Sequence, residues 1–210
     1  TLADRFGRKR LFVISLALFG VTSLLCGLAT SMPAMVAGRF LQGAAGGVML
    51  ICQVAVLTSQ FSDPVQRVRA FAAWGVVFGI GLGFGPIIGS AIVALASWQW
   101  VFLVHGPLAL LTLALAQYGA VESRDPDAER LDIGGMLTLS LAVLGTVFYI
   151  TQGADLGFAS PAALAILLLS VACLAAFILI ERHVAHPLFD FSVLRIRAFS
   201  GAMFASAGMN

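Results

Sequence analysis

Six apolar segments, each long enough to cross a lipid bilayer, dominate the sequence and restrict what the chain can fold into. A helix that crosses the hydrocarbon layer needs about 20 predominantly apolar residues. The segments are residues 11–31, 34–57, 71–95, 101–120, 133–152 and 161–181, and a seventh apolar segment starts near residue 199. Only 10% of the residues are charged, whereas a soluble domain has about 25%. The sequence therefore predicts an all-α, polytopic transmembrane helix bundle.

We interpret the chain as an internal fragment of a longer membrane protein, with six complete spans and the start of a seventh. Thr1 is not an initiator methionine, and the first ten residues, TLADRFGRKR, lack the pattern of a signal peptide. The last residues, FSGAMFASAGMN, resemble the opening of another span. The expected partners are the lipid bilayer and the remaining helices of the full-length chain. A net charge of +2 is too small to indicate a nucleic-acid partner.

The basic residues lie on alternate connections between the spans. Eleven of the 12 Lys and Arg residues occur before the first span or after the second, fourth and sixth spans. They are Arg5, Arg8, Lys9, Arg10, Arg67, Arg69, Arg124, Arg130, Arg182, Arg195 and Arg197. Short cytoplasmic loops of membrane proteins are enriched in Lys and Arg. The sequence therefore predicts that these connections are cytoplasmic and that the first span runs outward.

Arg39 is the remaining cation, and it lies inside the second span. An arginine near the middle of a bilayer costs about 2.5–3.5 kcal/mol on insertion scales, and such residues usually mark functional pathways. Gln42 and Gly43 follow at i+3 and i+4 and share a helix face with Arg39. In one interpretation, these three residues form an intramembrane polar path that faces other helices. In the other, Arg39 extends to the outer surface. We favour the polar path.

A glycine-rich stretch, GIGLGFGPIIGS, occupies residues 79–90 in the third span. It lacks the GxGxxG spacing after a strand that marks a dinucleotide-binding loop, and no lysine follows to complete a phosphate-binding loop. Its glycines recur at four-residue intervals, which creates a smooth helix face that a neighbouring backbone can approach closely. Pro86 lacks the N–H group that would bind the carbonyl of Leu82. The sequence predicts a bent, closely packed helix.

Three motifs, in this order along the chain, resemble those of the drug:proton antiporters of the major facilitator superfamily. LADRFGRKR resembles the loop motif before the third helix, GRFLQGAAGG the fourth-helix motif, and GLGFGPIIGS the antiporter motif of the fifth helix. The matching positions are Asp4, Arg5, Gly7, Arg8 and Lys9 in the first motif, Arg39, Gln42 and Gly43 in the second, and Gly81, Gly85, Pro86 and Gly89 in the third. Ala72 and Ser90 replace glycines of the family pattern.

The resemblance also implies a domain organisation. WQWVFLVHGPLALLTL is similar to the start of the family's sixth helix, with Gln99 and His105 in place of Arg and Asn. The two spans that follow resemble the extra helices of the fourteen-helix branch. Residues 1–120 would then belong to the N-terminal helix bundle, as helices 3–6 with the preceding cytoplasmic loop. Residues 121–198 would form two extra linker helices with cytoplasmic flanks, and residues 199–210 would start the C-terminal bundle.

The function that the resemblance implies is proton-coupled efflux of small lipophilic, drug-like molecules across the inner (cytoplasmic) membrane of a bacterium. The transporter would be monomeric and need no cofactor, and its first motif would act as a conformational latch. Export of an endogenous metabolite or a self-made antibiotic is the alternative, and a membrane-embedded enzyme is a remote one. An enzyme needs convergent titratable groups, whereas Arg39 is the single charge deep in the spans. No catalytic residue is expected.

The remaining polar residues and the cysteines have structural interpretations. Asp132 directly precedes the fifth span and is predicted to cap its helix. SRDPDAER, residues 123–130, is predicted to be a solvated loop. No metal site is expected, because Pro187 interrupts the helical spacing of the possible ligands His183, His186 and Asp190. The three cysteines lack CxxC spacing and are expected to pack as small buried residues: Cys26, Cys52 and Cys173.

Overall fold

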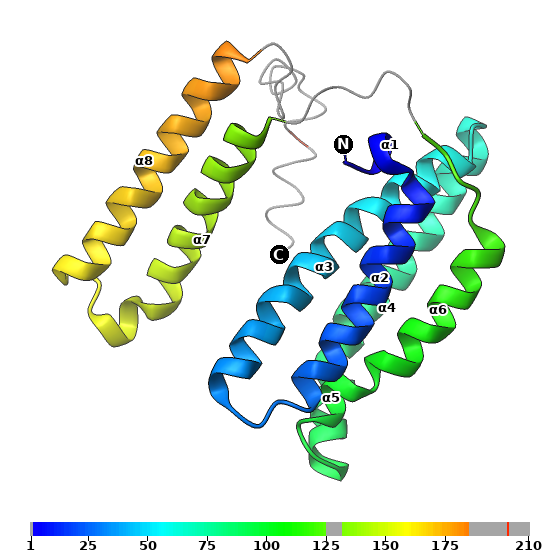
Figure 1. Ribbon diagram of the computed structural model, residues 1–210, viewed down its shortest axis with the longest axis horizontal. Helices are drawn as coiled ribbons and strands as arrows, with labels where there is room; N and C mark the ends of the chain where they lie inside the picture. The colour runs from blue at the N-terminus through cyan, green and yellow to red at the C-terminus, as the bar shows by residue number, and fades with distance from the viewer. Residues whose placement is uncertain (1, 125–131, 185–200, 202–210) are drawn as a thin grey trace. The chain divides into compact units, whose positions relative to one another are not determined.

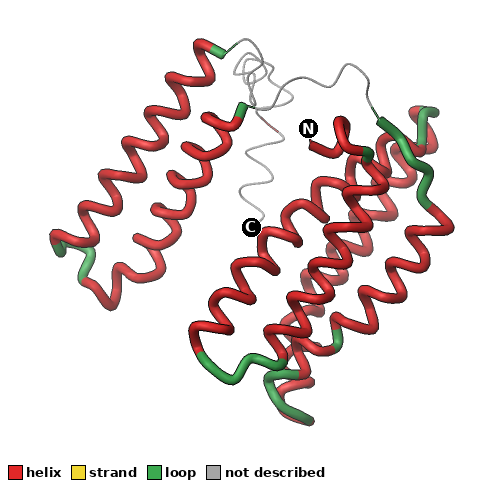
Figure 2. The backbone as a smooth tube through the Cα atoms, in the orientation of Figure 1, coloured by secondary structure: helices red, strands yellow, loops and turns green. Residues whose placement is uncertain are grey.

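The computed structural model describes residues 2–124, 132–184 and 201, and these residues form helices and short connections without a strand (Figure 2). The helices are α1 (Leu2–Phe6), α2 (Arg8–Gly27), α3 (Met32–Gln60), α4 (Pro64–Leu95), α5 (Trp100–Leu103), α6 (His105–Gly119), α7 (Ile133–Leu156) and α8 (Pro161–His183) (Figure 1). The predicted all-α fold is therefore confirmed. The expected seventh span lies almost entirely outside the described residues.

Six helical stretches of the described chain are long and apolar enough to cross a membrane, as the sequence predicted. They are α2, α3, α4, the stretch Trp100–Gly119, α7 and α8. The fourth of these stretches is interrupted at Val104, between α5 and α6. Pro107 accounts for the break, because it has no N–H group to bind the carbonyl of Leu103.

The connection between α3 and α4 is shorter than the sequence predicted. We expected helices to end at residue 57 and to resume at residue 71, but α3 continues to Gln60 and α4 begins at Pro64. Asp63 explains the early start, because its side chain accepts a hydrogen bond from the backbone N–H of Gln66. The proline that follows is well suited to a first helical position. Arg67 and Arg69 therefore lie within the first turns of α4.

Short polar side chains cap most of the long helices at their N-termini. The caps of α3, α4, α7 and α8 are Ser31, Asp63, Asp132 and Ser160. Asp132 accepts a hydrogen bond from the backbone N–H of Gly135 at 2.9 Å, which confirms its predicted role. The exceptions are α6, whose N-cap residue Val104 makes no capping hydrogen bond, and α2, whose N-cap residue is Gly7, with a φ of 104° and no side chain to act as a cap.

The chain divides into two compact units, residues 1–128 and 129–210. In the first unit, α2 packs along α3 and α6 and also contacts α5. Two glycines permit close contacts of α2. A Cβ atom at Gly20 would lie 2.7 Å from Cβ of Ala109, and one at Gly38 would lie 2.8 Å from Sγ of Cys26. Cys26 and Cys52 are buried, as expected, whereas Cys173 is only partly buried.

Helix α4 has a different environment from α2. It is one continuous helix through Pro86, and none of its residues is buried among the described residues. A Cβ atom at any of its glycines would meet no atom within 4 Å in the described part of the chain. The neighbour that a close-packed glycine face requires is thus not among the described residues.

The second unit contains the helical hairpin of α7 and α8. Its turn includes Gly157, whose φ of 80° falls in the left-handed region that glycine adopts most readily. The hydroxyl of Tyr149 donates a hydrogen bond to the carbonyl of Phe158 at 3.3 Å, which ties α7 to this turn. The two helices approach closely at Gly145, which faces Ser170. A side chain at position 145 would collide with the Ser170 hydroxyl.

Candidate functional site

A polar network inside the first unit connects α3 to α2. The guanidinium of Arg39 donates a hydrogen bond from Nη1 to Oε1 of Gln42 at 2.6 Å. The amide nitrogen of Gln42 in turn donates to Oγ of Ser23 on α2. Gln42 and Ser23 are buried, with 3% and 0% of their surfaces exposed. A buried amide is costly unless it is paired, so Gln42 is fixed between its two partners.

Phe102 of α5 completes the surroundings of Arg39. The guanidinium carbon of Arg39 lies 5.4 Å from the centre of the Phe102 ring, within the range of a cation–π interaction. The charge of Arg39 is thus held by an amide of its own helix and by an aromatic ring of another helix. Within the described chain, the Arg39 residue itself remains exposed.

The predicted polar path is brought together only in part. Arg39 and Gln42 interact directly, whereas Gly43 is exposed and a Cβ atom there would meet no described atom within 4 Å. Ser23 and Phe102 belong to the network, but sequence reasoning did not single them out. Phe102 lies in the segment that resembles the start of the family's sixth helix. A serine in an apolar span, such as Ser23, is a weaker signal.

His105 lies at the start of α6, where the family pattern has an asparagine. Its ring makes a T-shaped contact with the ring of Phe19 on α2, with 5.7 Å between the ring centres. Its Nδ1 atom is buried and has no hydrogen-bond partner among the described residues. This side chain is therefore part of the contact between α2 and α6 and does not join the Arg39 network in the described chain.

The residues of the loop motif surround the start of α2. Asp4 lies on the short helix α1, and its Oδ1 atom pairs with Nη2 and Nε of Arg8 at 2.6 and 2.7 Å. Gly7 lies between these two residues, at the junction of α1 and α2, and has a positive φ. The Arg5 guanidinium lies 5.9 Å from the Phe6 ring centre, and Lys9 Nζ donates to the carbonyl of Gln117 at 2.8 Å. All five motif residues thus lie at one end of the unit.

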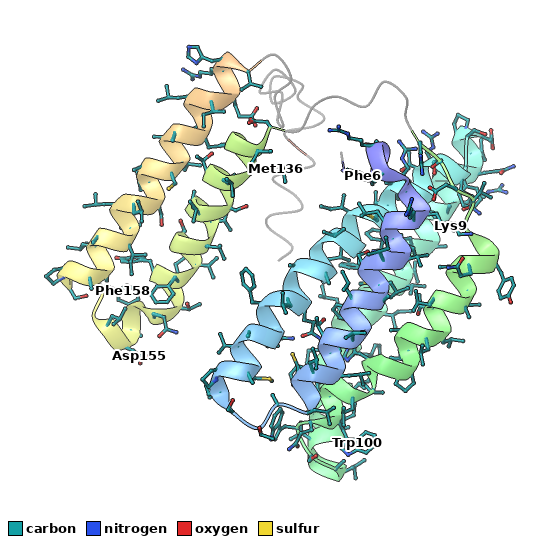
Figure 3. All side chains as sticks on the ribbon, in the orientation of Figure 1. Phe6, Lys9, Trp100, Met136, Asp155 and Phe158 are labelled. Atoms are coloured by element: carbon teal, nitrogen blue, oxygen red, sulfur yellow. The ribbon has the colours of Figure 1, made fainter. Side chains whose placement is uncertain are left out.

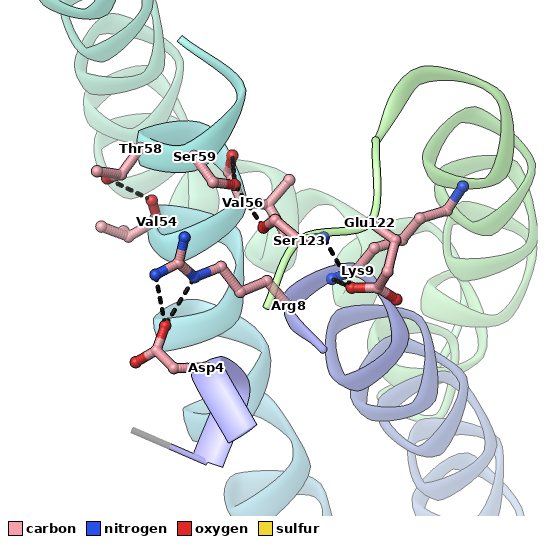
Figure 4. A network of polar contacts seen from close by, with 9 residues as sticks. All are labelled: Asp4, Arg8, Lys9, Val54, Val56, Thr58, Ser59, Glu122 and Ser123. Carbon is pink, nitrogen blue, oxygen red and sulfur yellow. Dashed lines mark hydrogen bonds and ion pairs between the residues drawn. The ribbon is translucent and has the colours of Figure 1, made fainter. Parts of the chain in front are cut away.

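A second acid, Glu122, also lies at this end of the unit, and sequence reasoning missed it (Figure 4). Its carboxylate accepts hydrogen bonds from the backbone N–H groups of Lys9 and Arg10. The sequence signal was slight: a single acid directly after a predicted span, beside a segment interpreted as a solvated loop. Its contact with residues 9 and 10 depends on tertiary structure, because 112 and 113 positions separate the partners.

The residues of the antiporter motif lie on α4, away from these two clusters. Cβ atoms at Gly81, Gly85 and Gly89 would contact no described atom, and α4 runs without interruption through Pro86. Ser90, which replaces a glycine of the family pattern, directs its hydroxyl to the carbonyl of Ile87 at 2.9 Å. The structure therefore does not bring this motif together with Arg39 among the described residues.

No group of three or more His, Cys, Asp or Glu side chains could hold a metal ion in the part of the chain that the structure describes. His183, one of the possible ligands considered from sequence, lies 2.7 Å from the carbonyl of Leu179 through Nδ1. The other two, His186 and Asp190, lie outside the described residues. The polar clusters at Arg39 and Glu122 are thus the candidate functional features of the first unit.

Comparison with known proteins identifies the family of this chain. Residues 1–209 match the Major Facilitator Superfamily over almost the whole chain. The chain belongs to the major facilitator superfamily. The resemblance to this superfamily in the sequence motifs is therefore confirmed, and the chain is part of a multi-pass membrane protein.

Several relatives within the major facilitator superfamily carry names that refer to resistance. Multidrug resistance protein Stp of Mycobacterium tuberculosis is 29% identical over 203 residues, which cover 97% of this chain and 38% of Stp. Puromycin resistance protein pur8 of Streptomyces alboniger is 33% identical over 201 residues, which cover 96% of this chain and 40% of pur8. Methylenomycin A resistance protein of Bacillus subtilis is 30% identical over 210 residues, covering 100% of this chain and 45% of the relative.

The chain spans less than half the length of these relatives. Its matched region nevertheless includes both polar clusters and α4, since residues 1–209 belong to the family. Membership in the major facilitator superfamily places the chain in a family of transporters and not of enzymes. The roles of individual residues within that family remain predictions.

Proposed function

We propose that the full-length protein is a secondary active transporter that exports small lipophilic, drug-like molecules in exchange for protons. Family membership and the resistance names of the relatives support efflux as the direction of transport. The observation that carries the proposal is the hydrogen-bond chain from Arg39 to the buried side chains of Gln42 and Ser23. A permanent charge retained within a membrane span has a cost that a purely structural protein would avoid.

Arg39 would act in this mechanism as a fixed positive charge and not as the proton carrier. A guanidinium keeps its proton at any physiological pH, so it cannot load and release protons during a transport cycle. Its field lowers the pKa of an acid that comes close to it and thus favours release of that acid's proton. We therefore expect the proton-carrying carboxylate on another part of the full-length chain, and Gln42 and Phe102 to hold Arg39 in place for it.

The loop motif would act as a conformational latch at the cytoplasmic side. The Asp4–Arg8 ion pair presents one charged group of each sign beside the start of α2. Contacts that such groups make in one conformation of the transporter and lose in another shift the equilibrium between the two. The ordered helix α1 and the Gly7 turn support this role, because they hold the pair close to α2.

A fourteen-helix arrangement is part of the same proposal. The hairpin of α7 and α8 forms within a unit of its own, which agrees with two linker helices between the bundles.

The proposal also includes the orientation of the first unit in the membrane. Figure 3 labels Lys9 and Trp100 at opposite ends of the helices of this unit. Basic residues favour the cytoplasmic side of a membrane and tryptophan favours either interface. We therefore assign the Lys9 end to the cytoplasm and the membrane to the inner membrane of a bacterium.

A narrower substrate range is the second candidate function. Two of the relatives are named for resistance to a single compound, puromycin or methylenomycin A, and not to many drugs. The transporter would then export one metabolite or self-made antibiotic by the same proton exchange. A panel of chemically diverse compounds separates the two candidates, because a multidrug exporter should respond to several unrelated structures.

The test uses the full-length protein in inside-out membrane vesicles whose interior has been acidified. A substrate should cause proton release that a pH-sensitive dye detects, and labelled substrate should accumulate inside the vesicles. Vesicles with the Arg39→Ala variant at equal protein level should show neither signal. Accumulation that continues after a protonophore has removed the pH gradient would contradict proton exchange. The absence of both signals for every compound would contradict drug efflux.

A further inference from the structure

The first turn of α2 obtains its hydrogen-bond acceptors from a distant part of the chain. The first N–H groups of a helix have no partner within the helix and need a cap. Gly7, the N-cap residue, has no side chain to provide one. Instead, the N–H of Arg8 donates to the carbonyl of Ser123 at 3.0 Å. Those of Lys9 and Arg10 donate to the two carboxylate oxygens of Glu122 at 3.1 and 3.0 Å.

The charge of Glu122 suits this position. The N-terminus of a helix carries a partial positive charge, so a carboxylate is stabilised there. Hydrogen bonds to an ionised acceptor are stronger than those between neutral groups. The carboxylate also accepts the N–H of Ser123 at 3.1 Å, which orients the acid relative to its own backbone. Glu122 thus caps α2 from a distant position in the sequence, whereas α3, α4, α7 and α8 are each capped by the polar residue directly before the helix.

Gly7 leaves the space that this carboxylate occupies. A Cβ atom at position 7 would lie 2.9 Å from Oε1 of Glu122, closer than real Cβ contacts allow. The φ of 104° would also strain any other residue type at this position. The glycine of the loop motif therefore serves two purposes at once: it permits the turn after α1, and it admits Glu122 to the start of α2.

Further contacts connect the ends of three helices around this cap. Lys9 Nζ donates to the carbonyl of Gln117 in the last turn of α6. The side chain of Gln60, at the end of α3, donates to the carbonyl of Gly119 at 2.7 Å. The hydroxyls of Ser123 and Ser59 are 2.9 Å apart. The segment that contains Glu122, residues 117–123, is thus hydrogen-bonded to both α2 and α3.

From this geometry we infer that Glu122 is the positioning residue of the loop Asp4–Lys9. Its carboxylate fixes the start of α2 against the end of α6, and thereby fixes the place at which Asp4 and Arg8 face the cytoplasm. The inference rests on the proposed function in one respect, because the loop is the proposed latch. The cap itself can be measured without any transport.

The structural test is hydrogen exchange of the backbone amides at positions 8–10 in the full-length protein, reconstituted in lipid nanodiscs. Glu122→Ala should accelerate exchange of the Lys9 and Arg10 amides about fivefold, the ratio that corresponds to the typical cost of losing an N-cap. Glu122→Gln should have a smaller effect, because one oxygen remains. Tyr118→Ala, which removes a side chain that is 94% exposed in the last turn of α6, is the matched control and should change neither amide.

The transport test separates positioning from substrate binding. Glu122→Ala should lower the maximal efflux rate while the KM for substrate stays unchanged, and Glu122→Gln should restore part of the rate. If the parent protein does not transport, the proposed function fails while the exchange result still tests the cap. Unchanged exchange at Lys9 and Arg10 in Glu122→Ala would overturn the inference. Faster exchange with an unchanged maximal rate would also overturn it.

A double variant addresses the contact between Gly7 and Glu122 directly. Gly7→Ala should lower the unfolding temperature through both backbone strain and collision with the carboxylate. In the Glu122→Ala background only the strain remains. The double variant should therefore lose less stability than the sum of the losses in the two single variants. This comparison remains informative if Glu122→Ala is poorly stable, because it can be repeated with Glu122→Asp, which withdraws the carboxylate by one methylene. Full additivity with both substitutions would overturn the inference.

Discussion

Helices α2 and α4 both contain glycines within a membrane span, and their surroundings differ. In α2, a Cβ atom at Gly20 or Gly27 would lie 2.7 Å from a side-chain atom of another helix. In α4, Cβ atoms at the glycines of the 79–90 stretch would meet no described atom within 4 Å. Glycines recur at four-residue intervals in α4, whereas α2 contains two glycines that are seven positions apart. Regular glycine spacing therefore indicates a helix face that another helix can approach closely. Whether a glycine makes such a contact depends on the presence of a neighbouring helix.

The largest expected effect is that of a bulky residue at the α2–α6 contact. Gly20→Leu should lower the unfolding temperature strongly and reduce the yield of folded protein. Overpacking costs about 1–3 kcal/mol, and we expect the upper end because the first carbon alone would collide with Ala109. Gly75→Leu on α4 is the matched control, since its Cβ atom meets no described neighbour. Equal thermal stability of the two variants in nanodiscs would remove the distinction between these helices.

The second prediction concerns the polar network that ties α3 to α2. Arg39→Lys keeps the charge but loses the planar group that binds Gln42. A hydrogen bond to a charged group contributes about 1.5–3 kcal/mol, so we expect efflux at least about tenfold slower. Arg69→Lys, in the first turns of α4, is the control and should transport normally. A fully active Arg39→Lys variant would support the alternative in which Arg39 extends to the outer surface.

The third prediction uses α4 itself. Gly85→Leu should leave the unfolding temperature close to that of Gly85→Ala, because no described atom faces this position. It should nevertheless lower efflux several-fold or cause a proton leak, if the remainder of the transporter docks on this face. Efflux and proton flux measured together in vesicles at matched protein levels give the answer. Normal coupling in both Gly85→Leu and Pro86→Ala would mean that the glycine face receives no helix.

The smallest expected effect compares the two ways of capping a helix. Asp63→Ala removes the local cap of α4 and should cost about 1 kcal/mol of stability. The neighbouring substitution Ser62→Ala should have almost no effect. Thermal unfolding measures both. A loss for Asp63→Ala much larger than that for Glu122→Ala would show that the local cap contributes more than the long-range cap of α2.

The sequence predicted those parts of the site that depend on neighbouring residues. Arg39 and Gln42 are three positions apart, so helical geometry alone places their side chains together. Asp132 lies directly before its helix and caps it as expected. The connection between α3 and α4 was predicted too long, because the cap formed by Asp63 and Pro64 starts α4 before its apolar segment begins.

By itself, the sequence determined the spans, the family and the local pairs, because apolar length and helical period depend on consecutive residues. Only the tertiary structure decided which partners complete the polar clusters. Ser23 reaches Gln42 across 19 positions, and Glu122 reaches Lys9 across 113. No local period relates such residues. Their contacts follow from the packing of α2 against α3 and α6, which brings buried polar groups and the uncapped start of α2 to the acceptors they need.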